Sequence, residues 1–310
     1  MPDSPIAGSD LVRRFIFEHR PVRGHWVHLD AAWRELRAHH DYPPAVRDLL
    51  GEAVAAAVLL AAALKFQGTL TLQLQGNGAV RLLVAQCTND LRLRAVARFD
   101  AARIAAADRA KGAFRALVGD EGRLTVTIEA TERGSRYQGI VPLTGASLAE
   151  SLEAYFASSE QLPTRVRLIA NDARAAGLLV QKLPGGGRRE PLDDSQIDEA
   201  WRAAQAGAAS IEPAALLTDR IEPVLERAFA GHDLRLFRGA AVRFECRCSP
   251  ERVSGVLKSL GADEVRDILR EQGAVAVTCE FCHRPYRYDA VDIESLFAAA
   301  PPRDNPSSLH

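Results

Sequence analysis

Residues 45–66, which read AVRDLLGEAVAAAVLLAAALKF, decide the fold of this chain. Two prolines stand just before this stretch and Gly68 just after it, as is typical of the two ends of a helix. From Ala53 to Leu64 the helix is apolar on every side, and a helix of that kind in a soluble protein is buried on every face. Its many alanines allow neighbouring elements to approach closely. The sequence therefore predicts a central helix enclosed by sheet.

The same apolar run is not expected to cross a membrane. It ends at Lys65, and a transmembrane helix needs about 20 consecutive apolar residues. The 310 residues carry a net charge of only −1, so charge gives no reason to expect nucleic acid as the main partner. Residues 1–5 lack the basic and then apolar pattern of a secretory signal, and we expect a cytoplasmic protein. Stable disulfides are rare in that compartment, where close-spaced cysteines indicate metal or redox chemistry.

Strand patterns lie on both sides of the central helix. Leucines alternate cleanly at 69–75, and Gly76-Asn77-Gly78 then indicates a hairpin. Asp30 is a candidate N-cap for a helix that ends at His39, and a further helix is predicted at 147–158. The other predicted strands are 12–17, 25–29 (after a break at Gly24), 79–86, 91–99, 124–130 and 136–141 (around a turn at 133–135), 165–171 and 177–183. The predicted class is α+β, with a mostly antiparallel sheet wrapped around the buried helix.

The pattern changes at the glycine-rich stretch 184–189, which is typical of a linker. Helices are predicted beyond it at 195–206, 213–217 and 222–229. Their apolar faces are modest, so we expect loose packing against the first domain. The predicted organisation is an α+β core at 10–183, a linker with helices at 184–240 and a small C-terminal zinc-binding domain at 241–298. The first ten residues and the tail at 299–310 are expected to be disordered.

Four of the five cysteines lie in two close pairs, Cys246 with Cys248 and Cys279 with Cys282. Between the pairs, helices are predicted at about 250–260 and 263–272, followed by a strand at 274–278. Another strand at 286–288 and a last helix capped by Asp289 follow the second pair. This segment has few large apolar side chains, and small units of that kind need a staple. One zinc ion held by the four thiolates would provide it.

The spacing leaves two interpretations of this cluster open. The zinc site is either purely structural or switched by oxidation, which would remove a thiolate ligand and with it the folding free energy that the metal supplies. A thioredoxin-type dithiol is disfavoured, because the C-x-x-C pair does not begin a helix in a βαβ unit. His283 is a possible substitute ligand, but it is better explained, with Arg247 and Arg284, as a source of positive charge that favours thiolates. Cys87, on a predicted strand, is expected to be buried and without a redox role.

Several motifs resemble those of the 33-kilodalton chaperonin family, whose members are redox-regulated heat-shock holdases. The resemblance covers most of residues 10–298. It is carried by FECRCSPERV at 244–253, Leu260-Gly261, CEFC at 279–282 with Tyr286, LKFQG at 64–68, LQLQG at 72–76, RYQGIVPL at 136–143, Tyr155-Phe156, SEQLPT at 159–164 and AAGLL at 175–179.

The resemblance implies a reduced, inactive form in which Cys246, Cys248, Cys279 and Cys282 hold one zinc ion. It further implies that oxidative stress expels the zinc and forms the disulfides Cys246–Cys248 and Cys279–Cys282. The zinc domain and the linker helices then unfold, and the protein dimerises and holds unfolding client proteins without ATP. The core at 10–183 would carry client binding and dimerisation.

Two other classes of function fit the sequence less well. A constitutive zinc-ribbon module that contacts RNA or ribosomes would need a basic, aromatic-lined face, whereas the region after residue 240 is mixed in charge. An enzyme is not expected, because the chain has no P-loop, nucleophile elbow or metalloprotease motif.

Overall fold

The computed structural model describes residues 10–107, 113–131, 136–143, 145–184, 193–217 and 220–298. The chain divides into two compact units, Met1–Glu245 and Cys246–His310, and each is described by itself. Several predicted features lie outside the described residues: both disordered ends except Asp10, the turn at 133–135 and nearly all of the glycine-rich linker.

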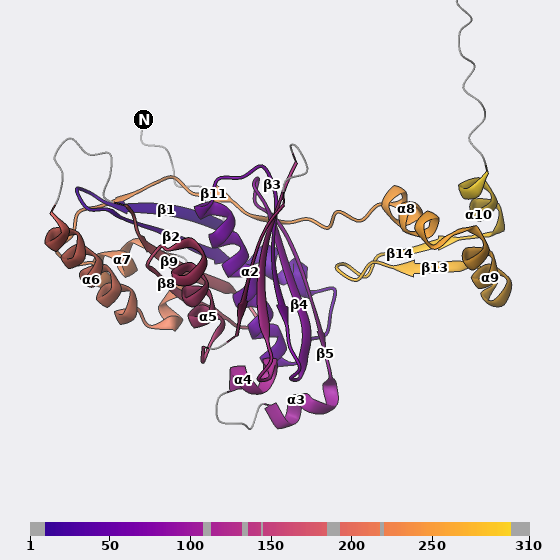
Figure 1. Ribbon diagram of the computed structural model, residues 1–310, viewed down its shortest axis with the longest axis horizontal. Coiled ribbons are helices and arrows are strands. Elements are labelled where there is room, and N and C mark those ends of the chain that lie inside the picture. The colour runs from indigo at the N-terminus through magenta and orange to yellow at the C-terminus, as the bar shows by residue number, and fades with distance from the viewer. Residues whose placement is uncertain are drawn as a thin grey trace, which may run out of the picture. The chain divides into compact units, whose positions relative to one another are not determined.

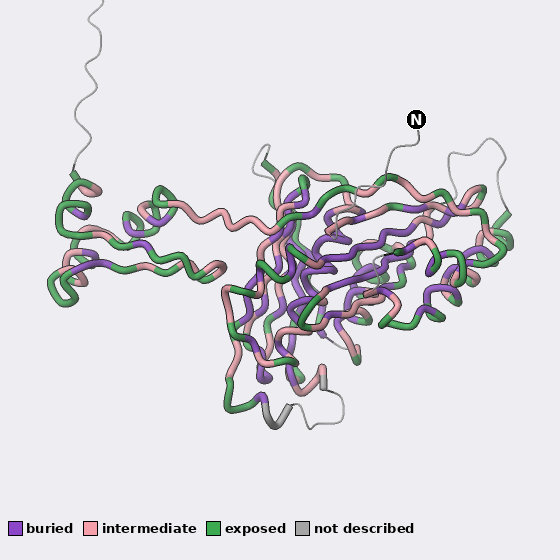
Figure 2. Tube along the Cα trace, turned by 180° about the vertical axis from the view of Figure 1, so that it is seen from behind, coloured by how far each residue is buried: buried purple, intermediate pink, exposed green. Residues whose placement is uncertain are grey.

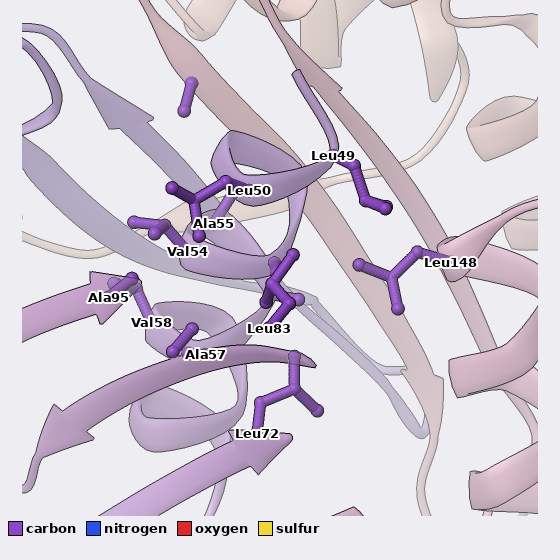
Figure 3. Packing of buried hydrophobic residues seen from close by; sticks show 14 of the residues in the cluster. Leu49, Leu50, Val54, Ala55, Ala57, Val58, Leu72, Leu83, Ala95 and Leu148 are labelled. Atoms are coloured by element: carbon purple, nitrogen blue, oxygen red, sulfur yellow. The ribbon is translucent and has the colours of Figure 1, made fainter. Parts of the chain in front are cut away.

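The predicted central helix is confirmed as α2, Pro44–Ala63. It contacts strands of both large sheets of the first unit, and fourteen of its twenty residues are buried. In Figure 3, Val54 and Val58 of this helix lie among Leu72, Leu83 and Ala95 of the surrounding strands. Alanine and valine on the helix leave room for leucine on the strands, so one continuous core forms around α2.

Two six-stranded sheets enclose this helix and confirm the predicted α+β class (Figure 1). Sheet A has the order β10 (Leu234–Leu236), β1 (Leu11–Phe17), β2 (Val22–Leu29), β9 (Ala175–Lys182) and β8 (Thr164–Ala170), with β11 (Ala240–Ala241) also paired to β1. Sheet B has the order β12 (Arg243–Phe244), β5 (Arg92–Phe99), β4 (Val80–Thr88), β3 (Gly68–Gln75), β6 (Arg123–Ala130) and β7 (Arg136–Pro142). All neighbouring strands are antiparallel except β12 and β5, which are parallel.

The prediction of a break at Gly24 is wrong. Gly24 lies inside β2, opposite Phe15 of β1. A Cβ atom at Gly24 would lie 2.0 Å from the Phe15 ring. Glycine is therefore required here because it leaves room for the Phe15 ring. It does not end the strand.

The start of the helix after Asp30 also differs from the prediction. The helix is α1, Ala31–Arg37, and the side chain of Asp30 does not cap it. Instead Asp10 caps it from a distance, because its Oδ1 atom accepts hydrogen bonds from the backbone N–H groups of Asp30 at 2.8 Å and Ala32 at 3.0 Å. A cap that is twenty residues away cannot be found from local spacing.

Four further helical segments lie among the described residues that precede the linker. The helices α3 (Ala101–Ala107) and α4 (Ala113–Val118) follow β5 and were not predicted. The helix α5 (Leu148–Tyr155) was predicted, and it continues into a π-helical turn, η1 (Phe156–Glu160). Ser147 caps α5 by accepting a hydrogen bond from the N–H group of Glu150.

The linker helices pack tightly, contrary to the prediction of loose packing. They are α6 (Asp194–Ser210), the 3-10 turn η2 (Pro213–Leu217) and α7 (Glu222–Ala228). With Phe229, which caps α7, they bury Trp201 and other apolar side chains in a second core against sheet A. Gly207 lets α6 and α7 approach so closely that an added Cβ would lie 2.4 Å from the carbonyl oxygen of Ala228. The composition of the linker does not predict this tight packing. Alanine and glycine add little apolar surface, but their small side chains allow the helices to approach closely.

The second unit has the predicted sequence of elements. These are α8 (Pro250–Leu260), α9 (Ala262–Gln272), the hairpin β13 (Val275–Thr278) and β14 (Pro285–Tyr288), and α10 (Ala290–Phe297). Figure 2 shows long buried stretches in the first unit and only scattered ones in this unit. None of the helices in the described part of the chain is both long and apolar enough to cross a membrane.

Candidate metal centre

The C-x-C half of the site is an extended segment between β12 and α8. On its N-terminal side, Glu245 is fixed to β5 by its backbone N–H group, which donates to the carbonyl of Leu93 at 2.9 Å. The Glu245 carboxylate also pairs with Arg92 at 2.8 Å. On its C-terminal side, Ser249 caps α8 and Pro250 is the first helical residue, as predicted. Within the second unit, Cys246 and Cys248 therefore lie on a short extended segment that leads directly into the capped start of α8.

The C-x-x-C half is the turn that joins β13 to β14. The N–H group of Cys279 donates to the carbonyl of Arg284 at 3.0 Å, and the N–H group of His283 donates to the carbonyl of Cys279 at 2.8 Å. The backbone of His283 has a φ of 51°. This value lies in the left-handed region that such a tight turn requires. The position of His283 is thus explained by backbone geometry.

The two halves bring all four predicted cysteines together. Their Sγ atoms lie within 4.8 Å of one another. Cys246 and Cys279 are 3.6 Å apart at sulfur, and Cys248 and Cys282 are 3.5 Å apart. A tetrahedral zinc ion with Zn–S bonds of about 2.3 Å holds its sulfurs about 3.8 Å apart. The donor set and the spacing therefore fit one tetrahedral, thiophilic metal ion, and the histidine ring of His283 is not part of this group.

The thiols differ in how readily they ionise when no metal is bound. Burial raises the pKa of the Cys248 thiol, but the nearby Tyr286 hydroxyl and the other three thiols outweigh that effect and lower this pKa to about 7. Burial, followed by the neighbouring thiols, raises the pKa of Cys282 to about 12. Arg284 lies close enough to Tyr286, Cys248 and Cys282 that its own pKa is raised. Positive charge near the thiols was predicted from the sequence, and Arg284 supplies it.

The fold around the cysteines has a small core. Leu257, Val265, Val275 and Ile293 are its buried members, with partly buried side chains around them. Val256, Leu260 and Val291 remain more than half exposed on α8 and α10. Such a core is small for a free-standing unit of this length, and small units of this kind need a further stabilising link, which a metal ion held by the four cysteines would provide.

One neighbour of the cysteines was not found from the sequence. Tyr286 was assigned only to a strand, although alternation along β14 indicates that Tyr286 and Tyr288 share one face. Cys87 is completely buried, as predicted, and burial raises the pKa of its thiol to about 12.

Comparison with known proteins supports the resemblance seen in the motifs. Residues 10–289 match the family described as Hsp33 protein. The chain is 41% identical over 290 residues to the 33 kDa chaperonin of Methylobacillus flagellatus, which covers 93% of this chain and 94% of that protein. It is 43% identical over 297 residues to the 33 kDa chaperonin of Pseudomonas paraeruginosa, which covers 95% of this chain and 97% of that protein.

The fold has a counterpart among solved structures. The crystal structure of the 33 kDa chaperonin, a heat shock protein 33 homolog, from Thermotoga maritima superposes with a TM-score of 0.74. The match covers 93% of this chain and 98% of that one, at 24% sequence identity. This likeness concerns the fold alone.

Proposed function

Because the chain belongs to the Hsp33 family, which is a family of chaperones and not of enzymes, we propose that it is a redox-regulated, ATP-independent holdase of the cytoplasm. In the proposed resting state, Cys246, Cys248, Cys279 and Cys282 hold one zinc ion as thiolates and the chaperone is inactive. Oxidation then produces the active form, which binds unfolding proteins, prevents their aggregation and forms a homodimer.

The observation that carries this proposal is the meeting of four free thiols within 4.8 Å on a unit with a small core. A bound zinc ion would supply folding free energy, on the order of 10–16 kcal/mol in small zinc-finger peptides. The unit would lose that contribution as soon as its sulfurs are no longer available as thiolates. The same cysteines therefore serve as staple and as sensor.

The oxidation step balances with peroxide as the oxidant. Two thiols lose two electrons and two protons to form one disulfide, and hydrogen peroxide is reduced to two molecules of water. We propose the pairs Cys246–Cys248 and Cys279–Cys282, since each pair lies on one short segment. Neither disulfide ties one half of the site to the other, so the unit is free to unfold.

Unfolding is proposed to extend into the linker helices. Their second core covers one face of sheet A, with Phe15, Phe17 and Trp26 on the strands and Trp201 and Phe229 on the linker side. Release of the linker would expose large apolar side chains of both partners. Contiguous apolar surface of this kind is what binds other partly unfolded chains.

The proposal is tested by comparing reduced and oxidised protein in an aggregation assay with a thermally unfolding client and no ATP. The oxidised form should suppress aggregation at substoichiometric to equimolar ratios, and the reduced, zinc-loaded form should not. Equal suppression by the two forms would exclude a redox switch and would leave a constitutive zinc module.

A further inference from the structure

The stretch between the last linker helix and the first cysteine of the metal site is held by both large sheets. Residues 233–245 follow α7, precede Cys246 and contain β10, β11 and β12, all within the first unit. β10 and β11 pair with β1 of sheet A, and β12 pairs with β5 of sheet B. The N–H group of Glu18 donates to the carbonyl of Asp233 at 2.8 Å, and that of Glu245 donates to β5 at 2.9 Å. We call this stretch the latch.

The side chains of the latch belong to both large hydrophobic cores. Val242 is buried in the core around α2, and Phe244 packs against that core with its ring centre 5.4 Å from that of His39. Leu234 and Leu236 pack against the second core, which the linker helices share with sheet A. One end of the latch is therefore held by the core around α2, and the other end is part of the packing of the linker.

Charged groups hold the C-terminal end of the latch. Arg92 of β5 pairs with Glu245 at 2.8 Å and with Asp90 at 2.6 Å. Arg243 of β12 pairs with the same two carboxylates, at 3.4 Å and 3.8 Å. All four side chains are partly exposed, so these pairs contribute less to stability than to the position of β12 against β5.

The attachments of the latch have a consequence for the linker helices that precede it. On their N-terminal side the chain is fixed in β9, and on their C-terminal side it is fixed by the latch. An unfolded chain with both ends fixed has fewer conformations than one with a single fixed end, so unfolding of the linker gains less entropy while the latch is in place. The latch therefore stabilises the folded linker in the manner of a cross-link.

Two features make the latch an attachment that is separate from the metal site and easily removed. The contacts described above all lie within the first unit, and β11 and β12 have only two residues each, so that they can open locally at small cost. We propose that the latch stays on the core when the second unit loses its fold, and that its detachment is a later step that frees the linker helices. Arg92 and Phe244 are the positioning residues of the latch. That release of the linker activates the protein rests on the proposed function.

The test uses the full chain, reduced and stripped of zinc with a chelator, and follows hydrogen exchange by mass spectrometry. Exchange reports the attachment of the latch, because the N–H groups of Val242 and Arg243 donate to carbonyls of the core. At room temperature the second unit should be unprotected, whereas the latch, α6 and α7 should remain protected. Mild heating should then remove protection from the latch, α6 and α7 together, while α2 keeps its protection.

Variants of the zinc-free protein locate the effect in the latch. Phe244→Ala should speed the exchange of α6 and α7 about tenfold, as expected when packing is lost at a partly buried aromatic ring. Phe244→Leu should restore most of the protection. Arg92→Met should speed the exchange of the same helices, whereas Arg123→Met, at an exposed arginine of the same sheet, should not.

Four results would overturn the proposal. The second unit keeps its protection without zinc, the latch loses protection together with the second unit, α6 and α7 lose protection while the latch keeps it, or Phe244→Ala leaves α6 and α7 unchanged. Failure of the proposed function is a separate result, because these measurements involve neither an oxidant nor a client. It would appear as an oxidised wild-type chain that does not suppress aggregation.

Discussion

The sulfur atom of Cys248 lies 3.5 Å from that of Cys282, 34 residues further along the chain. This contact crosses between the two halves of the site, as does the 3.6 Å contact of Cys246 with Cys279. Disulfides formed across the halves would close long loops and stabilise the unit by about 3–4 kcal/mol. Such disulfides would oppose the unfolding of the unit that the proposed activation requires.

The first prediction concerns which disulfides form. Peptide mapping by mass spectrometry after peroxide treatment should find Cys246 linked to Cys248 and Cys279 linked to Cys282. Cys87 should remain a thiol, because it is completely buried and burial keeps it protonated. Detection of Cys246–Cys279 and Cys248–Cys282 as the main products would contradict a mechanism of release by unfolding.

The second prediction concerns the role of the metal as a staple. Cys279→Ser should lose tight zinc binding and, with it, hydrogen-exchange protection in α8, α9 and the β13–β14 hairpin. Protection in α2 should persist, because its core does not include these elements. Cys87→Ala is the matched control and should retain one zinc ion per chain. Normal hydrogen-exchange protection in metal-free Cys279→Ser would show that the small core is sufficient to keep the unit folded without the metal.

The third prediction compares two helical glycines. A Cβ atom at Gly207 would lie 2.4 Å from the Ala228 carbonyl oxygen, whereas one at Gly255 meets nothing within 4 Å. Gly207→Ala should therefore loosen the linker by about 1–3 kcal/mol and lower the oxidant or temperature needed for activation. Gly255→Ala should stabilise α8 by up to about 1 kcal/mol and raise that threshold. Activation curves with graded peroxide would measure both shifts, and shifts in the same direction would refute this account of the linker.

The fourth prediction concerns the carboxyl of Glu52. Its pKa is raised from 4.5 to about 7, so the folded state holds the proton more tightly than the unfolded state. The resulting stabilisation is complete below about pH 4.5 and is lost as the pH rises through about 7. Glu52→Gln should therefore remove this pH dependence and raise core stability at about pH 8 by about 1–3 kcal/mol relative to wild type. Urea unfolding at two pH values, read by a probe in the core, measures the effect, and an unchanged pH profile would argue against it.

Much of the fold could be predicted because its signals are local. The apolar run around Val54 and Val58 requires burial on all sides, and the alternation at 69–75 fixes which strand face meets it. The metal-site candidates could likewise be predicted, from the close spacing of the cysteine pairs and from the helix-start signal at Ser249. The family motifs add the expectation of a redox switch.

The features that were missed depend on partners far away in the sequence. Gly24 was taken as a break because the ring of Phe15 that occupies its face belongs to another strand. Asp10 caps a helix twenty residues away, and Arg92 fixes Glu245 from a distant part of the sequence. The linker was expected to be loose because small residues such as Gly207 carry no apolar pattern, although their size is what permits close packing. In the sequence, Glu52 is only a single charged residue at the start of an apolar run, so nothing predicted that its pKa would be raised.

The central claim is that one thiol cluster is both the staple and the switch. The most direct test follows zinc release, the number of free thiols and the suppression of client aggregation in one sample during peroxide treatment at mild heat. We predict that one zinc ion leaves as four thiols are lost, and that suppression of aggregation rises with zinc release. Full suppression while zinc is still bound, or complete oxidation without any gain in suppression, would contradict the account.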